Sequence, residues 1–227
     1  MEHNSELKWI CDLLKENGVN YWLDSGTLLG LVREGEILEG DKDIDLGMWA
    51  EQEPLLKNAL PHFKKKGYKI YTTNYRGLNF KYRFIPTSED SRMEIDINLF
   101  RKYRERAWCP QVYRVESPFS KQNPLYYIVG LPRYIIQMCY KRKRYVAVNR
   151  WPWSLTYKVY SWWVPTRYYE SLKKLEQGYP VPQDTASYLE FRYGRWQVPN
   201  QAWSFFTDDR AIRYVKPEEL VNDIKRF

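Results

Sequence analysis

The sequence has few cysteines, and their placement excludes the common cysteine-built sites. Its 227 residues include three cysteines, Cys11, Cys109 and Cys139, and these form no C-x-x-C pair. An odd number of widely separated cysteines favours neither a disulfide framework nor a zinc knuckle. The first residues, MEHNSELKWICDLLKENG, also lack the basic and then apolar order of a secretory signal peptide. We therefore expect a reducing, cytoplasmic location.

Long apolar runs and nucleic-acid-binding signatures are also absent from the sequence. The apolar stretch 126–140 is interrupted by Pro132 and Arg133, and it is too short to span a bilayer core of about 30 Å. No RNP, KH or helix-turn-helix pattern occurs, so we expect no nucleic-acid partner. Hydrophobic residues make up 44% of the chain, which is enough to bury a core and excludes a disordered protein.

The positive charge is concentrated in one segment. The net charge is +8, yet residues 133–174 alone hold ten Lys or Arg against the single acid Glu170. The rest of the chain is close to neutral. Basic residues interleaved with aromatic ones are typical of an interfacial segment that contacts an anionic membrane. The residues that we expect to face such a membrane are Lys141, Arg142, Lys143, Arg144, Trp151 and Trp153. A helical subdomain with an aromatic core, or a groove for an anionic glycan, is the alternative.

Hydrophobic periodicity predicts a mixed sheet with flanking helices, in the α/β (α+β) class. Apolar spacing of three and four residues predicts helices over 5–17, 25–32 and 51–66. Alternation predicts strands over 19–24, 43–49, 68–73, 78–85, 92–100 and 107–116. We expect residues 1–124 to form the core and residues 125–227 to be a mainly helical, basic and aromatic region that completes the same domain.

The stretch DKDIDLGMW places carboxylates at every second residue of a predicted strand. Asp43 and Asp45 therefore share one face, while Ile44 points to the other. In RMEIDINLF, Asp96 lies on an equivalent face. Two neighbouring strands would aim these three aspartates at one point, where a divalent cation would offset their repulsion. The alternative is two half-exposed strands with acidic outer faces.

The stretch DSGTLLG places small residues where a strand passes into a helix. Backbone N–H groups at a helix N-terminus bind anions, and glycine allows a phosphate to approach closely. Nearby basic side chains would add phosphate contacts. The alternatives are an ordinary turn glycine and a solvated strand face. The residues that we expect to bind phosphate are Ser25, Gly26, Thr27, Arg33, Lys81 and Arg83.

These motifs together resemble a known family. A G-[S/T] turn, a D-x-D strand and a further Asp on a later strand resemble the nucleotidyltransferase superfold. More narrowly, SGTLLGLVR followed by DKDIDLG is similar to the LicD family, which includes fukutin and fukutin-related protein. VPQDTASYLEFRYGRWQVP, with its Y-G-x-W-x-x-P ending, is also similar to that family. The gap after Thr27 is longer than the commonest nucleotidyltransferase spacing, so the acidic register begins at either Asp41 or Asp43.

The resemblance implies transfer of a substituted phosphate. LicD-like enzymes take a CDP-activated alcohol, such as CDP-choline or CDP-ribitol, pass the phospho-alcohol to a glycan hydroxyl and release CMP. On this basis Asp43, Asp45 and Asp96 would hold Mg²⁺ or Mn²⁺, and Asp96 would be a metal ligand, the general base or both. The acceptor would be a glycan or lipid-linked glycan, with the protein peripheral on the inner face of the membrane. The alternatives are a nucleotidyltransferase that releases pyrophosphate and a non-enzymatic module that binds a membrane or polyanion.

Overall fold

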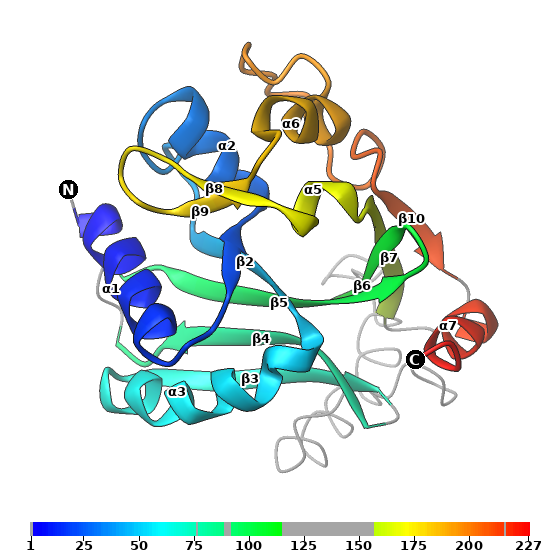
Figure 1. The fold of residues 1–227 in the computed structure, drawn as a ribbon, viewed down its shortest axis with the longest axis horizontal. Coiled ribbons are helices and arrows are strands. Elements are labelled where there is room, and N and C mark those ends of the chain that lie inside the picture. The colour runs from blue at the N-terminus through cyan, green and yellow to red at the C-terminus, as the bar shows by residue number, and fades with distance from the viewer. Residues whose placement is uncertain (1, 76, 89–91, 115–156, 216) are drawn as a thin grey trace, which may run out of the picture.

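A branched mixed sheet forms the centre of the protein (Figure 1). The computed structural model describes residues 2–75, 77–88, 92–114, 157–215 and 217–227. The main strand order is β1-β2-β5-β6-β7-β10, and β4 branches from β5 and pairs with β3. These strands are β1 (Tyr21–Leu23), β2 (Asp43–Trp49), β3 (Tyr68–Tyr75), β4 (Leu78–Pro86), β5 (Glu94–Tyr103), β6 (Arg106–Arg114), β7 (Tyr157–Pro165) and β10 (Ile212–Val215). A separate pair is formed by β8 (Leu172–Lys174) and β9 (Pro180–Pro182).

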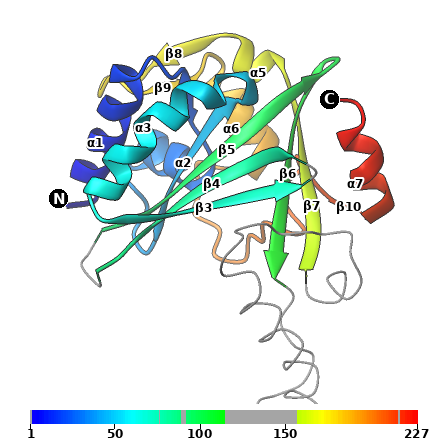
Figure 2. The ribbon, with the colours of Figure 1, turned by 90° about the horizontal axis from the view of Figure 1, so that it is seen from below.

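Helices cover both faces of this sheet. They are α1 (Glu2–Glu16), α2 (Ser25–Arg33), α3 (Glu53–Lys65), α5 (Arg167–Glu170), α6 (Thr185–Tyr193) and α7 (Pro217–Ile224), with a 3₁₀ turn at Ala50–Gln52. Figure 2 shows α1 and α3 on the near side of the sheet and α2 and α6 behind it. Phe63 of α3 stacks on Phe84 of β4 at 3.8 Å between ring centroids, which fixes α3 against the apolar face. The opposite face, on the side of α2 and α6, carries Asp43, Asp45 and Asp96 as well as the buried Phe100.

The predicted elements of the first half are confirmed. Strand β2 has the predicted bounds, and Ile44 and Leu46 are fully buried while Asp43 and Asp45 are only partly buried. Helix α2 begins directly after Asp24, whose carboxylate accepts a hydrogen bond from the backbone N–H of Ser25. An α/β architecture with a mixed sheet and flanking helices is therefore what the structure shows.

The expected mainly helical second half is wrong for the residues that the structure describes there. Residues 157–227 hold four strands as well as three helices. Strand β7 pairs with β6 and β10 because its side chains alternate between two apolar faces, as Trp162 stacks on Phe100 while Trp163 packs near Trp108. Residues 125–156 lie outside the described residues, so the division near residue 124 stays a prediction.

The pairing of β2 with β5 positions the polar face. These strands run parallel, and Asp45 lies directly opposite Asp96 while Asp43 lies opposite Glu94. Strand β4 continues the sheet on the far side of β5 and runs antiparallel to it, with Arg83 opposite Asp96. Across the described ranges, no helix combines the length and the apolar character that crossing a membrane requires.

Candidate active site

Three carboxylates converge on the polar face of the sheet, as the sequence predicts. One carboxylate oxygen from each of Asp43, Asp45 and Asp96 lies within 4.8 Å of the other two. The parallel register of β2 and β5 produces this convergence, because alternate residues of both strands point to the same face. The arrangement brings together the oxygen ligands that Mg²⁺ prefers. The catalytic role of the three residues stays a prediction.

The cluster is electrostatically unfavourable when it stands alone. Burial raises the pKa of Asp43, and the neighbouring Asp96 raises it further. Burial likewise raises the pKa of Asp45 well above its usual range, with the Asp43 carboxylate as the next cause. Lys81 opposes both shifts but does not cancel them. A bound cation would relieve this repulsion.

Lys81 and Arg83 of β4 supply the positive charge beside the cluster. The Lys81 Nζ lies 2.5 Å from Asp96 Oδ2, and the Arg83 Nε lies 3.6 Å from Asp96 Oδ1. Arg83 also binds Glu94 through its Nε at 2.8 Å. Two cations thus face four acids, since Asp43 and Asp45 belong to the same group. Asp96 Oδ1 is buried and accepts no hydrogen bond from the described residues. The three carboxylates, and the capacity of Asp96 Oδ1 to accept a further ligand, fit a divalent cation.

The turn formed by Ser25, Gly26 and Thr27 adjoins the cluster. The Thr27 Oγ1 accepts a hydrogen bond from the backbone N–H of Asp45 at 2.9 Å, which fixes α2 to β2. Ser25 has a positive φ of 47°, a conformation that is strained for a residue with a side chain. Its buried Oγ has no hydrogen-bond partner among the described residues. Phosphate binding by this turn stays a prediction.

Asp41 joins the site beside Gly26. A Cβ atom on Gly26 would lie 2.6 Å from Asp41 Oδ2, so a larger residue at this position would displace the Asp41 carboxylate. Burial, with the charge of Asp43 as the next cause, raises the pKa of Asp41 to about 6. The N-terminus of α2 therefore has one of the protein's own carboxylates as a neighbour. Asp41 lines a pocket together with Asp45, but it is not one of the three carboxylates that converge.

Arg33 is not brought to the carboxylates. It ends α2, about 12 Å along the helix axis from Ser25 at 1.5 Å per residue. Its Nη2 lies 2.6 Å from Glu34 Oε1, and its Nη1 donates to the backbone carbonyl of Trp196 at 3.3 Å. Arg33 therefore connects the end of α2 to the segment after α6. The structure places it in a pocket wall and away from Asp43, Asp45 and Asp96.

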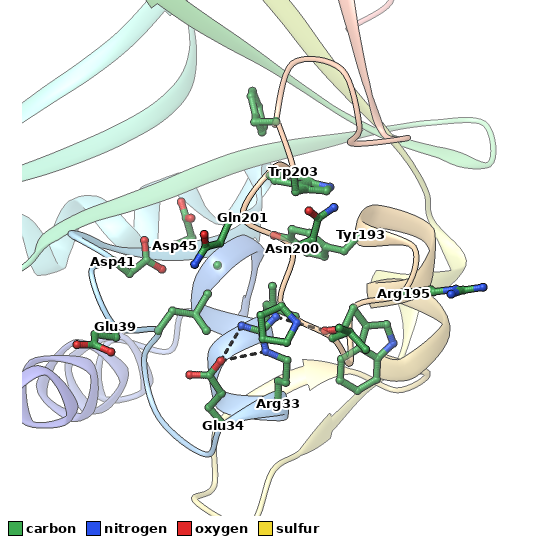
Figure 3. Close-up of a pocket in the computed structure, with 17 residues that line it drawn as sticks. Arg33, Glu34, Glu39, Asp41, Asp45, Tyr193, Arg195, Asn200, Gln201 and Trp203 are labelled. Atoms are coloured by element: carbon green, nitrogen blue, oxygen red, sulfur yellow. Dashed lines mark hydrogen bonds and ion pairs between the residues drawn. The ribbon is translucent and has the colours of Figure 1, made fainter.

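A pocket of about 620 Å³ lies between α2, the following loop and residues 193–205 (Figure 3). Asp41 and Asp45 line one end of it, and Tyr193 and Trp203 form an aromatic wall. The ring centroids of these two aromatic residues are 4.8 Å apart. The Y-G-x-W stretch thus lines a cavity. It also ends α6, since Gly194 has a φ of 66° that suits glycine at a helix end.

A buried polar network that the sequence did not predict supports the start of α2. Arg192 of α6 lies between two buried aspartates: its Nε is 2.9 Å from both carboxylate oxygens of Asp209, and its Nη1 is 3.3 Å from Asp24 Oδ1. Tyr188, one turn earlier on α6, also donates a hydrogen bond to Asp24. The signal in the sequence is the spacing of Tyr188 and Arg192 at i and i+4, which places both on one face of the helix.

The residues expected to face a membrane, Lys141 to Arg144 with Trp151 and Trp153, lie outside the described residues. Their predicted role is not tested by the structure.

Comparison with known proteins gives partial matches. The chain is 46% identical over 59 residues to an uncharacterized protein of Rickettsia typhi, covering 26% of this chain and 19% of that protein. It is 43% identical over 44 residues to the human "Ribitol 5-phosphate transferase FKRP", covering 19% of this chain and 9% of that protein. A solved structure of the lincosamide antibiotic adenylyltransferase LnuA, lincomycin-bound, aligns with a TM-score of 0.34 and 21% identity over 46% of this chain and 60% of that chain.

The family model "LicD/FKTN/FKRP, nucleotidyltransferase domain" matches residues 18–133, which is 116 of the 227 residues. This match contains the α2 turn and the strands β2, β4 and β5 that carry the acidic and basic side chains described above. The chain therefore belongs to the LicD/FKTN/FKRP nucleotidyltransferase-domain family.

Proposed function

We propose that this protein is a metal-dependent transferase that moves a phospho-alcohol from a CDP-activated donor to a hydroxyl of a cell-surface glycan and releases CMP. The transferred group would be phosphocholine, ribitol phosphate or a similar phospho-alcohol. The observation that carries the proposal is the convergence of three carboxylates within 4.8 Å, with too few cations to balance them, in a chain of the LicD family. Such an acidic cluster suits a divalent cation that bridges to substrate phosphates.

Asp43, Asp45 and Asp96 are the residues that would hold Mg²⁺ or Mn²⁺. When bound, the metal would neutralise part of the charge on the donor diphosphate. Lys81 and Arg83 lie beside Asp96, and in this proposal they would contact the phosphate that leaves with CMP. The backbone N–H groups at the start of α2 lie on the opposite side, near Asp45, where the transferred phosphate would sit.

The transfer step is a substitution at phosphorus. The acceptor oxygen forms a bond to the phosphorus that carries the alcohol. The bond from that phosphorus to the bridging oxygen breaks, and its electron pair stays on the phosphate of CMP. The proton of the acceptor hydroxyl passes to a carboxylate of the cluster, with Asp96 as the candidate, or to water. Positioning and charge compensation by the residues named above provide the catalysis.

The experiment that tests this proposal measures the products. The full chain is incubated with CDP-choline or CDP-ribitol and Mg²⁺ or Mn²⁺, with and without bacterial cell-surface glycan, and CMP is quantified. Release of CMP that depends on the metal supports the transferase. Pyrophosphate release from CTP would instead identify a nucleotidyltransferase. If neither product forms and CMP does not bind, the non-enzymatic module is the better explanation.

We also propose that residues 133–174 dock the enzyme on an anionic membrane, where a lipid-linked acceptor would sit. Six of its ten basic residues, Arg133, Lys141 to Arg144 and Arg150, precede strand β7 and support this docking, whereas Trp162, Tyr168 and Tyr169 of the same segment are buried in the core. Neutralising Lys141, Arg142, Lys143 and Arg144 together should reduce sedimentation with vesicles that contain phosphatidylglycerol. High salt should release the wild type only in part, because it screens charges and leaves aromatic insertion intact. A wild type that ignores such vesicles at low salt would refute the docking.

A further inference from the structure

We propose that the pocket between α2 and residues 193–205 binds the sugar ring of the acceptor glycan, so that the attacking hydroxyl enters the carboxylate cluster from this side. The inference rests on the proposed transferase function and adds to it the position of the acceptor. It also gives a role to the C-terminal segment, because residues 193–205 lie beyond the region that the family model matches.

The position of the pocket relative to the cluster is the first argument. Strand β5 lies between β2 and β4, so Lys81 and Arg83 stand on one side of the three aspartates. The pocket reaches the cluster at Asp45 and Asp41, and none of its described lining residues comes from β4 or β5. Phosphoryl transfer places the attacking and leaving oxygens roughly in line, on opposite sides of the phosphorus. If CMP leaves toward Lys81 and Arg83, the acceptor arrives from the pocket.

The charge of the pocket wall is the second argument. Glu34, Glu39, Asp41 and Asp45 line it, against the two cations Arg33 and Arg195. Arg33 is already paired with Glu34 at 2.6 Å. Arg195 extends away from the other labelled side chains in Figure 3. Because Glu34 is paired with Arg33 and Asp45 would hold the metal, Glu39 and Asp41 are the remaining acidic side chains of this wall. Carboxylates accept hydrogen bonds from hydroxyls, so the wall suits a neutral molecule with hydroxyl groups.

The chemistry of the pocket at the end away from Asp41 and Asp45 is the third argument. A sugar ring offers C–H groups on its faces and hydroxyls around its edge. The Tyr193 and Trp203 rings provide an apolar surface, and the exposed amides of Asn200 and Gln201 provide donors and acceptors. The Trp203 Nε1 is buried and has no hydrogen-bond partner among the described residues. A ligand hydroxyl would satisfy it. A volume of about 620 Å³ is within the range of small-molecule pockets.

The test compares binding of the two substrates in single variants of the full chain. The probes are CMP with Mg²⁺, followed by calorimetry, and methyl glycosides of hexoses and N-acetylhexosamines, followed by saturation-transfer NMR. Trp203→Ala should weaken binding of the glycoside at least tenfold and change CMP affinity less than twofold. Lys81→Met should do the reverse. The control is Tyr214→Ala, because Tyr214 is 52% exposed on β10 and does not line the pocket.

Two further variants keep the result interpretable. Trp203→Phe keeps an aromatic ring and removes the N–H, so its loss of glycoside binding should be smaller than that of Trp203→Ala. Gln201→Ala changes an exposed side chain and should weaken glycoside binding even if Trp203→Ala does not fold. Unchanged glycoside binding in both Trp203→Phe and Gln201→Ala would overturn the inference.

The inference and the proposed function fail in different ways. A wild type that binds none of the glycosides, or a Trp203→Ala variant that loses CMP and keeps the glycoside, overturns the acceptor site. In either case CMP release from a CDP-linked donor with water as acceptor still supports the transferase. A wild type that binds glycoside but releases no CMP from any donor overturns the transferase alone.

Discussion

Two groups of aspartates lie a short distance apart in this protein, and they differ in how their charge is matched. Asp24 and Asp209 are enclosed with Arg192, which binds both of them, and Asp24 also accepts hydrogen bonds from Tyr188 and the backbone of Ser25. Asp43, Asp45 and Asp96 face each other within 4.8 Å, and the cations beside them in the described part of the chain are Lys81 and Arg83 of β4.

The difference separates a structural role from a ligand-binding role. Buried charges that are paired and hydrogen-bonded hold elements in one arrangement, and removing one partner is costly. Carboxylates that outnumber their cationic partners raise the free energy of the folded state until a cation or a proton binds to them. The first group therefore fixes α6 against the start of α2, and the second is available to a ligand.

The largest expected effect is on stability, and it follows from removing Arg192, the cation of the first group. Replacing Arg192 by Met leaves two buried carboxylates without a cation, so the free energy of unfolding should fall by about 3–5 kcal/mol. Urea denaturation measures it. Arg195→Met is the control, because Arg195 is exposed and its loss should cost less than about 0.5 kcal/mol. Equal stability of the two variants would contradict a structural role for Arg192.

The second prediction concerns the unmatched group. Asp45→Asn should lower the rate of CMP release on the order of 100- to 1,000-fold, because it removes a ligand of the metal. Without metal its stability should equal or exceed that of the wild type, since repulsion from Asp43 is removed. Asp12→Asn, at an exposed site on α1, is the control for both measurements. Near-normal turnover of Asp45→Asn at saturating Mg²⁺ would show that the metal assignment is wrong.

The third prediction measures the ligand directly. Mg²⁺ at ten times its Kd should raise the free energy of unfolding of the wild type by about 1.4 kcal/mol, which corresponds to roughly 3–6 °C in Tm. The Asp45→Asn variant should show little of this shift, and Arg195→Met should show all of it. A shift of the same size in Asp45→Asn would place the cation elsewhere.

The smallest effect concerns two thiols whose pKa is set mainly by burial. Burial raises the pKa of Cys11 to about 12, and it does the same for Cys109. At pH 8 about one molecule in ten thousand would carry the thiolate at each position, so iodoacetamide should label neither until urea unfolds the chain. A Cys139→Ser background restricts the mass-spectrometric count to these two thiols. Rapid labelling of the native protein would show that the core around them is open.

The sequence predicts the carboxylate face well because the signal is local. Asp43 and Asp45 alternate with Ile44 and Leu46, and a period of two decides which side chains reach the core. Asp96 follows the same rule on β5. Only the assumption that the two strands are neighbours goes beyond local pattern, and the parallel register of β2 and β5 confirms it.

Other parts of the site depend on contacts between distant residues, which a local pattern does not contain. Arg192 looks like a solvent-facing residue of a short helix, yet it is 1% exposed because Asp24 and Asp209 enclose it. Arg33 follows the turn at Ser25 in sequence, yet one helix length carries it to the pocket wall. The strand over 157–165 pairs with β6 and β10. Its basic and aromatic composition does not predict this pairing when the segment is considered alone.

The link between Asp24 and Arg192 has a consequence for the order of events during synthesis. These residues are 168 positions apart, so at 5–20 residues per second Arg192 is added on the order of ten seconds or more after Asp24. Once Asp96 has been added, the nascent chain contains every carboxylate of the cluster, while the turn at Ser25 still lacks its buried support. We expect the ribosome-bound protein to be inactive until α6 emerges and docks, so translation itself delays the appearance of activity.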